Sequence, residues 1–443
     1  MTGANFLLDT GNEKILIDCG MLQREYPPTG GCDLANFAQF PYDPSTIDGL
    51  LVTHAHADHI GRIPKLIRDG LRSPIYSTAA TYDLAALMFD DALGIMQQDA
   101  LRRGCEMLYE KEDVDRALAL WQTHEYHESF DVGGGTAEFL DAGHILGSGM
   151  VRLSRGSRKI IFTGDIGNSP EPILNDTESS EGVHYLVMES VYGDRVHEAR
   201  EERREHLREF VEDIRRRKGT LLIPSFSIER TQVLLHELST MIEEEGMQPI
   251  PVYLDAPLAI QVTDIFRKHK KLLNPKTQTH FEQGSDPFSF KGLTLTVNTS
   301  ESSAIHKATN PKIIIAGAGM SSGGRIRAHE KYYLGDKHAT LLFVGYQTPG
   351  SLGRRIQDGE KRILIDGEHV RVYARIASLS GYSGHADRDQ LLNFVDRAGE
   401  SIERAFVTMG EPRASLFFAQ RVRDFLGVDA VVPQTGESYE IDW

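Results

Sequence analysis

The chain has 443 residues, of which 40% are hydrophobic, and a formal net charge of −16 at pH 7. A chain of this length and apolar content can bury a large core and is expected to form two domains or more. The negative net charge excludes a protein coated with basic residues for generic adhesion to nucleic acid. It does not exclude a nucleic-acid enzyme, because bound divalent metals or a single basic groove can reverse the local field.

No apolar run reaches the roughly 18 residues of a membrane span, so none is expected. The N-terminus lacks a basic segment followed by an apolar block and does not resemble a secretory signal. Cys19, Cys32 and Cys105 lack metal-type spacing and are too few for a disulfide framework. These features predict a cytoplasmic protein.

The first elements in chain order form a predicted β-hairpin. Its strands are expected at 6–8 and 14–18, with a turn at Thr10-Gly11-Asn12. Asp18 ends the second strand, where a carboxylate can orient a metal-binding histidine. A turn-capping aspartate is an equally good interpretation from the residues alone.

The segment H-A-H-A-D-H at 54–59 follows an apolar, strand-like run. Hydrophobic residues at helical spacing come after it, so the segment is expected to be a strand-to-helix turn. Such a turn can direct His54 and His56 to one point, and Asp58 and His59 to a second point nearby. Imidazole nitrogens and carboxylate oxygens suit zinc, with iron or manganese less favoured. A histidine-rich surface loop is the alternative, and the crowding of this segment after a buried strand argues against it.

Further strand ends bring polar side chains toward the same sheet edge. After a helical stretch at 79–120, a strand at 136–140 leads to His144, which is expected on a glycine-rich loop. A later strand ends at Asp165, and the next one delivers Glu189. Ligands converge at strand ends in layered α/β folds. His144 would give a first zinc its third nitrogen, and Asp165 can bridge two metals because a carboxylate can share its oxygens.

The composition changes at about residue 198. The segment 198–218 carries both charge signs but keeps the hydrophobic stripe of an amphipathic helix, and its arginines are interpreted as a solvated face, with RNA contact as the alternative. Strand and helix patterns then alternate, which predicts a parallel sheet covered by helices. The expected strands are 220–226, 251–255, 312–316 and 340–346, and the expected helices include 228–245 and 325–334.

The glycine-rich segment 317–325 opens one of those helices and can present backbone N–H groups to a phosphate. It lacks the lysine of a P-loop, which disfavours a nucleotide triphosphatase, and a tight packing turn is the alternative. Strands are expected again at 362–366 and 370–379, followed by His385 on a loop of small residues. A last strand-like run precedes Met409.

Taken together, these residues resemble a known family, the metallo-β-lactamase-fold nucleases of the β-CASP group. Its RNA-processing branch includes the endonuclease subunit of the pre-mRNA 3′-end cleavage machinery and its bacterial and archaeal relatives. The resemblance runs nearly from end to end, and the combination of motifs is specific. It is carried by Asp18, H-A-H-A-D-H at 54–59, His144, Asp165, Glu189 in E-S-V-Y-G, D-A-P-L-A at 255–259, G-M-S-S-G-G-R at 319–325 and S-G-H-A-D at 383–387.

The resemblance implies an α/β fold in which both ends of the chain build a four-layer αββα metallo-β-lactamase sandwich. A parallel-sheet β-CASP domain is inserted into that sandwich. The implied boundaries are 1–197 for the first part of the sandwich, 198–368 for the β-CASP domain and 369–443 for the return segment. The active site is expected in the cleft between the two domains.

The resemblance also implies roles for matching residues. The implied metal ligands are His54, His56 and His144 for one zinc, Asp58 and His59 for the other, and Asp165 as the bridge. The implied catalytic residues are Asp58, His385, which meets the scissile phosphate, and Glu189, which positions His385. The residues expected to bind substrate phosphates are Ser227, Arg230, Ser321, Ser322, Gly323, Arg325 and Ser383.

The sequence departs from the family pattern at two places. RNA-cleaving members usually carry a histidine on the last zinc within V-H-G-E, where this chain has Thr408-Met409-Gly410-Glu411. A thioether is a poor ligand for an oxygen-rich zinc site, so the second metal is expected to bind weakly or to be Mn²⁺ or Fe²⁺. The family also has one more strand before the position of Thr2-Gly3, so a shortened start is expected.

The expected function is a metal-dependent ribonuclease that hydrolyses RNA phosphodiester bonds with a metal-activated hydroxide. Endonucleolytic cleavage is expected, with 5′-exonucleolytic cleavage as a second activity. The open alternatives are a DNA nuclease of the same fold, a small-ester hydrolase, and a non-catalytic RNA-binding subunit with a weakened second metal site. The expected cofactors are two Zn²⁺ ions and the expected partner is single-stranded RNA, with a homodimer left open.

Overall fold

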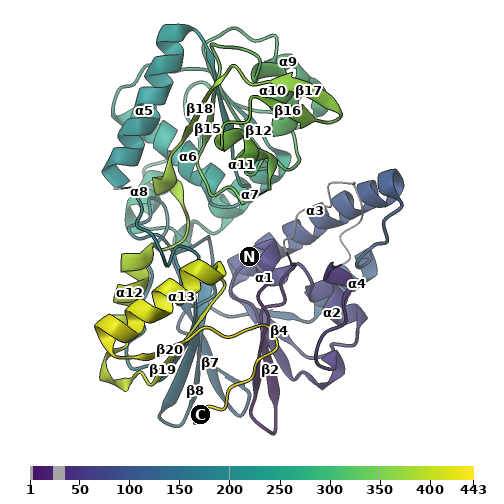
Figure 1. Ribbon diagram of the computed structural model, residues 1–443, viewed down its shortest axis with the longest axis vertical. Helices are drawn as coiled ribbons and strands as arrows, with labels where there is room; N and C mark the ends of the chain where they lie inside the picture. The colour runs from purple at the N-terminus through teal and green to yellow at the C-terminus, as the bar shows by residue number, and fades with distance from the viewer. Residues whose placement is uncertain (1–2, 23–34, 199, 349) are drawn as a thin grey trace. The chain divides into compact units, whose positions relative to one another are not determined.

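The structure of the protein is a computed structural model that describes residues 3–22, 35–198, 200–348 and 350–443. Thr2 and Cys32, on which two of the sequence predictions depend, lie outside the described residues. The chain folds into two compact units (Figure 1). The first unit comprises Met1–Val196 and His385–Trp443, and the second comprises His197–Gly384.

The chain returns to the first unit later than the sequence predicted. The return was expected at residue 369, whereas the first unit resumes at His385. The reason is strand β18 (Arg375–Ser378), which pairs in parallel with β15 (Thr340–Phe343) and so belongs to the sheet of the second unit.

The first unit contains two β-sheets, one of which has five strands in the order β1-β2-β3-β4-β5. Strands β1 and β2 form the expected antiparallel hairpin, and the remaining neighbours pair in parallel. The strands of this sheet are β1 (Phe6–Asp9), β2 (Lys14–Ile17), β3 (Gly49–Leu51), β4 (Ile75–Ser77) and β5 (Trp121–Thr123).

The other sheet has seven strands in the order β20-β19-β10-β9-β8-β7-β6. Strand β19 pairs in parallel with β10, so segments from both ends of the chain build this sheet. Its strands are β6 (Phe130–Val132), β7 (Gly135–Asp141), β8 (Gly149–Arg155), β9 (Arg158–Phe162), β10 (Tyr185–Glu189), β19 (Arg404–Thr408) and β20 (Asp429–Val431).

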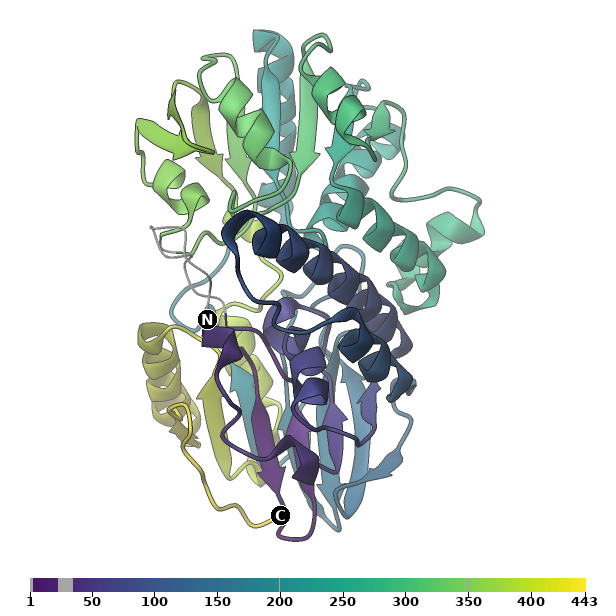
Figure 2. The ribbon, with the colours of Figure 1, turned by 90° about the vertical axis from the view of Figure 1, so that its right-hand side faces the viewer.

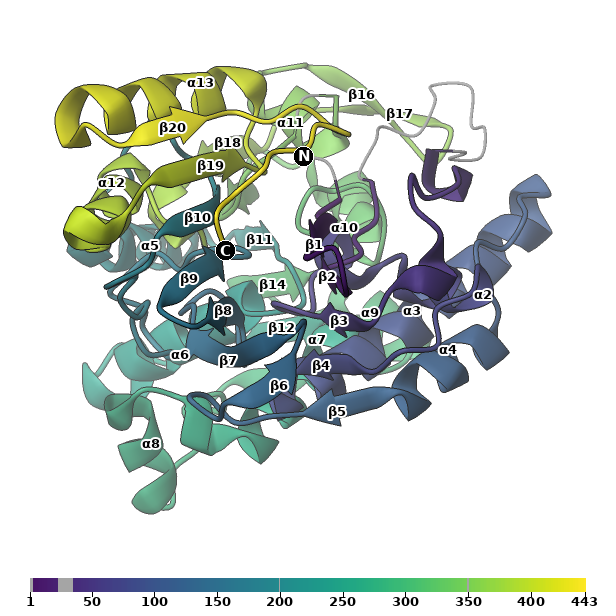
Figure 3. The ribbon, with the colours of Figure 1, turned by 90° about the horizontal axis from the view of Figure 1, so that it is seen from below.

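Helices cover the outer faces of both sheets (Figure 3). The helices of this unit are α1 (Ala57–Ile60), α2 (Ile63–Arg68), α3 (Ala79–Arg103), α4 (Lys111–Ala119), α12 (Arg388–Asp396) and α13 (Pro412–Arg421). Ile17, Phe139 and Val187 are among the buried residues that fill the core between the sheets. A second cluster packs α12 and α13 against the seven-stranded sheet, while α2, α3 and α4 lie outside the five-stranded one. The expected four-layer αββα sandwich is confirmed.

The helical stretch expected at 79–120 is two helices, α3 and α4, which lie side by side (Figure 2). Helix α3 ends at Gly104, whose φ of 68° provides a left-handed C-cap. Helix α4 then starts with a capping box formed by Glu110 and Asp113. The C-cap and the capping box are local features, and they divide a segment whose hydrophobic pattern is continuous in the sequence.

The second unit is built on a six-stranded sheet in the order β13-β12-β14-β11-β15-β18, and every pair in it is parallel, as expected. Leu222, Ile314 and Leu341 are fully buried in the core of this unit. Its other strands are β11 (Thr220–Pro224), β12 (Val252–Asp255), β13 (Leu293–Leu295) and β14 (Lys312–Ala316). Its helices are α5 (Arg200–Arg217), α6 (Arg230–Ser239), α7 (Pro257–Lys268), α8 (Pro275–Glu282), α9 (Thr299–Ile305), α10 (Ile326–Tyr333) and α11 (Leu352–Gln357).

A separate antiparallel hairpin of the second unit consists of β16 (Arg362–Ile365) and β17 (Glu368–Arg371). The single strand expected at 370–379 is therefore divided between β17 and β18. Among the helices that the structure describes, none combines the length and the apolar character needed to cross a membrane.

Candidate metal centre

The strand-to-helix turn after β3 carries the histidine-rich segment. Strand β3 lies between β2 and β4, and the chain leaves the sheet directly after it at the C-terminal edge of these parallel strands. His56 is the N-cap of α1, and the first turn of this helix contains Asp58 and His59. His54 and His59 are fully buried, whereas His56 is partly exposed.

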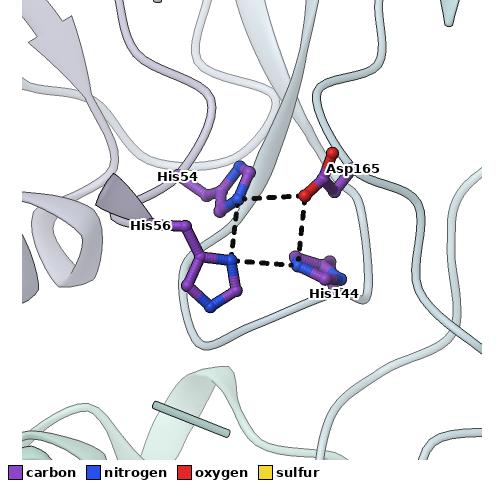
Figure 4. Close-up of side chains that lie close together, drawn as sticks. All are labelled: His54, His56, His144 and Asp165. Atoms are coloured by element: carbon purple, nitrogen blue, oxygen red, sulfur yellow. Dashed lines mark hydrogen bonds and ion pairs between the residues drawn. The ribbon is translucent and has the colours of Figure 1, made fainter. Parts of the chain in front are cut away.

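Four side chains from three loops converge beside this turn (Figure 4). Donor atoms of His54, His56, His144 and Asp165 all lie within 4.8 Å of one another. Asp165 Oδ2 lies 3.4 Å from His54 Nε2 and 3.5 Å from His144 Nε2. His144 comes from the loop after β7, and Asp165 from the loop after β9. The structure thus brings together the four residues that the sequence assigned to the first metal.

The ring nitrogens of this cluster face one another, and hydrogen bonds between the rings cannot satisfy all of these nitrogens. His56 Nδ1 lies 3.1 Å from His54 Nε2 and 3.3 Å from His144 Nε2, yet a neutral imidazole carries only one N–H. Burial lowers the pKa of His54 and His144 well below its usual value and the pKa of His56 to about 4, so these rings are neutral at pH 7. Neutral imidazoles that converge with a carboxylate fit a divalent metal ion.

A second set of contacts surrounds His59. Its Nδ1 lies 2.7 Å from Asp18 Oδ2, and its Nε2 lies 3.4 Å from Asp165 Oδ1. Both His59 Nε2 and Asp165 Oδ1 are buried, and neither has a hydrogen-bond partner within the described chain. A cation would satisfy both atoms. Asp18 also accepts hydrogen bonds from the backbone N–H and the hydroxyl of Thr53, so it fixes the ring of His59.

Asp58 stands apart from the converging donor atoms. It belongs to neither of the two acid and histidine clusters that could hold a metal in the described part of the chain. The residue is buried, and its backbone carbonyl accepts a hydrogen bond from the N–H of Ala4. Its charge nevertheless acts on the site, since it favours the protonated forms of His56 and His385. The assignment of Asp58 to a second metal stays a prediction.

His385 and Glu189 form a pair next to Asp165, in which Glu189 is fully buried and His385 is partly exposed. His385 Nδ1 lies 3.1 Å from Glu189 Oε1 and 3.9 Å from Asp165 Oδ2. A backbone bridge joins His385 to Gly167, and the N–H of Ile166 donates to Glu189 at 2.7 Å. Burial disfavours the imidazolium, but the carboxylates of Glu189 and Asp165 outweigh it and raise the pKa of His385 to about 9. His385 therefore holds a proton at neutral pH.

Met409 lies at the same sheet edge, because Thr408 pairs in register with Glu189. It is partly exposed and has a φ of 56°, in the left-handed region that methionine rarely adopts. The departure noted in the sequence thus falls beside the His385–Glu189 pair, and this position supplies a thioether in place of a ring nitrogen.

The residues predicted to bind phosphates lie in the second unit, and the side chains of Ser321 and Arg325 are hydrogen-bonded within it. The hydroxyl of Ser321 donates to the carboxyl of Glu330, and Arg325 Nη1 donates to Asp255 Oδ1 at 2.6 Å. These contacts fix the glycine-rich loop within its own unit. The remaining residues are two that are buried, Arg230 and Ser383, and three that are at least partly exposed, Ser227, Ser322 and Gly323. Phosphate contact by this set stays a prediction.

Sequence reasoning missed Thr53, which links two parts of the site. Its hydroxyl donates to Asp18 Oδ2 at 2.8 Å and lies 3.1 Å from His54 Nδ1. The available signal was a threonine that ends a buried strand directly before the first histidine. A hydroxyl at this point can act on both neighbours, since it donates one hydrogen bond and accepts others.

Two facing sheets with histidines and carboxylates gathered at the strand ends define a metallohydrolase of the αββα class. Three family descriptions match the chain: Metallo-beta-lactamase superfamily over residues 3–226, Beta-Casp domain over 231–356, and Zn-dependent metallo-hydrolase RNA specificity domain over 369–433. The chain belongs to the metallo-β-lactamase superfamily and, within it, to the β-CASP group. The resemblance inferred from its motifs is confirmed.

Similar proteins agree with this membership. The chain is 36% identical over 419 residues to Ribonuclease TTHA0252 of Thermus thermophilus, with 94% of this chain and 90% of the relative covered. It is 31% identical over 444 residues to Transcription termination factor FttA of Pyrococcus horikoshii, with 96% of this chain and 67% of the relative covered. A crystal structure of a protein of unknown function from Enterococcus faecalis V583 has the same fold, with a TM-score of 0.53 and 12% sequence identity over 98% of this chain and 96% of that chain.

Proposed function

We propose that this protein is a metal-dependent ribonuclease that hydrolyses phosphodiester bonds in single-stranded RNA. The observation that carries the proposal is the convergence of His54, His56, His144 and Asp165 beside the His385–Glu189 pair. Membership of the metallo-β-lactamase superfamily supports hydrolytic chemistry at this cluster. The match to an RNA specificity domain and the relative named as a ribonuclease support RNA as the substrate.

The proposed cofactors are two Zn²⁺ ions. Their ligands would be His54, His56 and His144 for the first ion, Asp58 and His59 for the second, and Asp165 for both. A bound pair of divalent metals would supply a water with a pKa lowered toward about 7 and a Lewis acid for the charge that develops on the phosphate. Because Met409 offers no nitrogen, the second ion is expected to bind more weakly or to be Mn²⁺ or Fe²⁺.

Residues of the chain itself would hold the phosphate and deliver a proton. His385 keeps Nδ1 toward Glu189, which leaves Nε2 as the ring atom that can reach a phosphate oxygen. A protonated Nε2 can bind the scissile phosphate and then donate its proton to the departing 3′ oxygen. Glu189 is fully buried and also accepts a hydrogen bond from Ile166, so it positions the ring and does not contact RNA. Asp18 positions His59 in the same way.

The proposed mode of cleavage is endonucleolytic, with 5′-exonucleolytic removal of nucleotides as a second mode. Met409 favours one rival, a DNA nuclease, since DNA-cleaving members of the group also lack a histidine at this position. The E-S-V-Y-G context of Glu189 resembles the RNA-processing branch and keeps RNA as the first choice. A homodimer stays a prediction from the sequence.

The test compares the zinc-loaded protein with the variants Asp165→Asn and Asp396→Asn. Asp396 is an exposed residue at the end of α12 and serves as the matched control. Removal of the Asp165 charge is expected to slow RNA cleavage by at least about 100-fold, because even outer-shell partners of metal ligands contribute 10–100-fold. The control is expected to cleave at the wild-type rate. Metal content measured by mass spectrometry is expected to approach two equivalents per chain.

Substrates labelled at either end distinguish the modes and the rivals. One RNA and one DNA of the same sequence are each labelled at the 5′ or the 3′ end and digested side by side. Internal fragments indicate endonucleolytic cleavage, whereas a ladder from the 5′ end indicates exonucleolytic removal. Faster hydrolysis of DNA would replace the ribonuclease with a DNA nuclease. RNA binding without hydrolysis by a metal-free protein would establish the non-catalytic subunit instead.

A further inference from the structure

The second unit carries a pocket that the proposed reaction does not use. It has a volume of about 560 Å³ and is lined by residues of α10, of β17 and of the segments that follow α9 and α10. Figure 1 labels these elements. His306, Lys331, Tyr332, His369 and Arg371 are among the residues that line it. All of its lining residues belong to the second unit, and none belongs to the proposed metal centre.

A rigid aromatic platform forms one side of the pocket. The rings of His306 and Tyr332 are stacked, with centroids 4.2 Å apart and an interplanar angle of 5°. Tyr333 packs edge-on against Tyr332 with a centroid distance of 4.8 Å. Tyr332 is nevertheless 57% exposed, so much of its ring is open to a ligand. An exposed ring that its neighbours hold in place is a stacking surface for a nucleobase, because every base presents a π face.

Buried hydrogen bonds fix the inner ring of this platform. His306 Nε2 lies 3.1 Å from His329 Nδ1, and His329 Nε2 lies 2.7 Å from Asp255 Oδ2. His329 and Asp255 are fully buried. A carboxylate can only accept, so His329 Nε2 donates to Asp255, and the contact between His329 Nδ1 and His306 Nε2 extends this buried chain to the platform. The ring orientation is thus set before a ligand binds, which reduces the entropy that binding must overcome.

The hairpin side of the pocket carries the guanidinium of Arg371 and the carboxylate of Glu368. Lys331 is paired with Glu368, but no ion pair within the described ranges includes His369 or Arg371. Arg371 donates a hydrogen bond to the hydroxyl of Tyr373 at 3.3 Å and lies opposite Arg362 across the hairpin. A guanidinium without an acidic partner is available for a phosphate, which it can bind through two parallel N–H groups.

We propose that this pocket binds one nucleotide of an RNA strand, with the base stacked on Tyr332 and a phosphate held by Arg371 and His369. The aromatic platform can stack on the base of a nucleotide, and the guanidinium of Arg371 beside it can bind the phosphate. The pocket volume is within the range of small-ligand sites. The choice of RNA as the ligand rests on the proposed function, because the base and phosphate of a free nucleotide would make the same contacts with the pocket. The site adds affinity for the RNA and takes no part in the chemical step.

Equilibrium binding tests the pocket in the full-length chain. A fluorescein-labelled, single-stranded RNA is titrated against the Asp165→Asn protein, in which cleavage is expected to be at least about 100-fold slower, and binding is followed by fluorescence anisotropy. Added Tyr332→Ala or Arg371→Ala is expected to raise Kd about 10-fold, since stacking on one aromatic residue supplies roughly that factor. Tyr332→Phe is expected to stay within about twofold because it keeps the ring. Tyr439→Ala, at a 39% exposed tyrosine of the first unit, is the control and is expected to have no effect.

Two further experiments distinguish RNA from a free nucleotide as the ligand and show which results would overturn the proposal. Adenosine and uridine 5′-monophosphate are titrated by calorimetry against the same variants. Loss of mononucleotide binding in Tyr332→Ala without any change in RNA affinity overturns the RNA site and replaces it with a free-nucleotide site. If RNA and both mononucleotides each bind all the variants with an unchanged Kd, the pocket proposal is overturned altogether. Crosslinks from 4-thiouridine RNA to the peptide that contains Tyr332 support it.

Hydrolysis of a small chromogenic phosphodiester by zinc-loaded chains with an intact Asp165 isolates the chemical step. The kcat/KM for bis(p-nitrophenyl) phosphate is expected to be the same in wild type and Tyr332→Ala, whereas KM for RNA rises and kcat for RNA is unchanged. A fall in the rate with the small ester would show that Tyr332 supports the fold or the chemistry, and would overturn the binding role. Absence of RNA hydrolysis in the wild type would defeat the ribonuclease proposal but not the pocket, because the binding measurements do not depend on hydrolysis.

Discussion

Two side chains, Asp18 and Thr53, set the imidazole of His59 in place without help from a metal. Asp18 Oδ2 lies 2.7 Å from His59 Nδ1 and accepts a hydrogen bond from the hydroxyl of Thr53 at 2.8 Å. Asp18 itself has a φ of 57°, in the left-handed region that aspartate adopts more readily than most residues. The buried hydrogen bonds of Asp18 present His59 Nε2 toward Asp165, so the donor atoms are preorganised for a cation.

The role of Asp18 leads to a prediction for the variant Asp18→Asn. The amide keeps the shape of the side chain but removes the charge that orients His59, so zinc affinity is expected to fall 10- to 100-fold. Competition with a chromophoric chelator measures the change, and Asp396→Asn is the surface control. Unaltered affinity in Asp18→Asn would mean that Asp18 only caps a turn, which was the other interpretation of this residue.

Met409 leads to a prediction in the opposite direction. Its φ of 56° is more readily adopted by histidine than by methionine, so Met409→His is expected to fold without loss of stability. The new imidazole lies beside Glu189 at the sheet edge and is expected to raise occupancy of the second metal toward one equivalent. Metal analysis after dialysis against limiting zinc measures the gain. Met409→Leu, which adds no nitrogen, should retain the wild-type metal content, and an equal gain in that variant would exclude ligation by the introduced imidazole.

At the scale of elements, the sequence predicted which polar residues lie at strand ends better than it predicted where helices and strands end. The loop positions of His54, His144 and Asp165 follow from apolar runs that end in polar residues, and each lies near a strand end in the structure. The break in the helical stretch at 79–120 depends on a left-handed Gly104, which the hydrophobic period does not reveal. The pairing of β18 with β15 is a long-range contact, so the return of the chain to the first unit was placed too early.

The buried hydrogen bond between α10 and the glycine-rich loop predicts a dependence on pH. Burial raises the pKa of Glu330, which contacts Ser321, from 4.5 to about 8. The folded chain therefore keeps a proton that the unfolded chain releases between these two pH values. The stability contribution is fully present below pH 4.5 and is lost as pH rises toward 8, with a slope of at most about 1.4 kcal/mol per pH unit.

Urea unfolding of the full-length protein at pH 5, 6, 7 and 8 measures this effect. The difference between wild type and Glu330→Gln isolates the one carboxyl group from all others. Wild type is expected to lose stability relative to the variant as pH rises. Parallel curves for the two proteins would show that Glu330 is ionised in the folded state.

At the scale of the whole molecule, the chain builds two units with separate hydrophobic cores and separate polar clusters. Phe139 and Val187 belong to the core of the sandwich, whereas Leu222 and Ile314 belong to the core of the inserted sheet. The proposed metal ligands are confined to the first unit, and the proposed nucleotide pocket is confined to the second. Each unit can therefore be perturbed through its own ligand.

Removal of metal is the sharpest test of this division. A ligand that binds only the folded form stabilises it by about 2.7 kcal/mol at 100 times its Kd, which corresponds to about 100-fold slower hydrogen exchange of the amides that its unit protects. Treatment with a chelator is therefore expected to accelerate exchange in β3, β8 and β9, by up to about 100-fold, and to leave β11 and β14 unchanged. Exchange followed by mass spectrometry of peptides from both units reports this directly. Equal acceleration in both units would mean that they unfold as one body, and no acceleration in either would mean that the histidine cluster binds no metal.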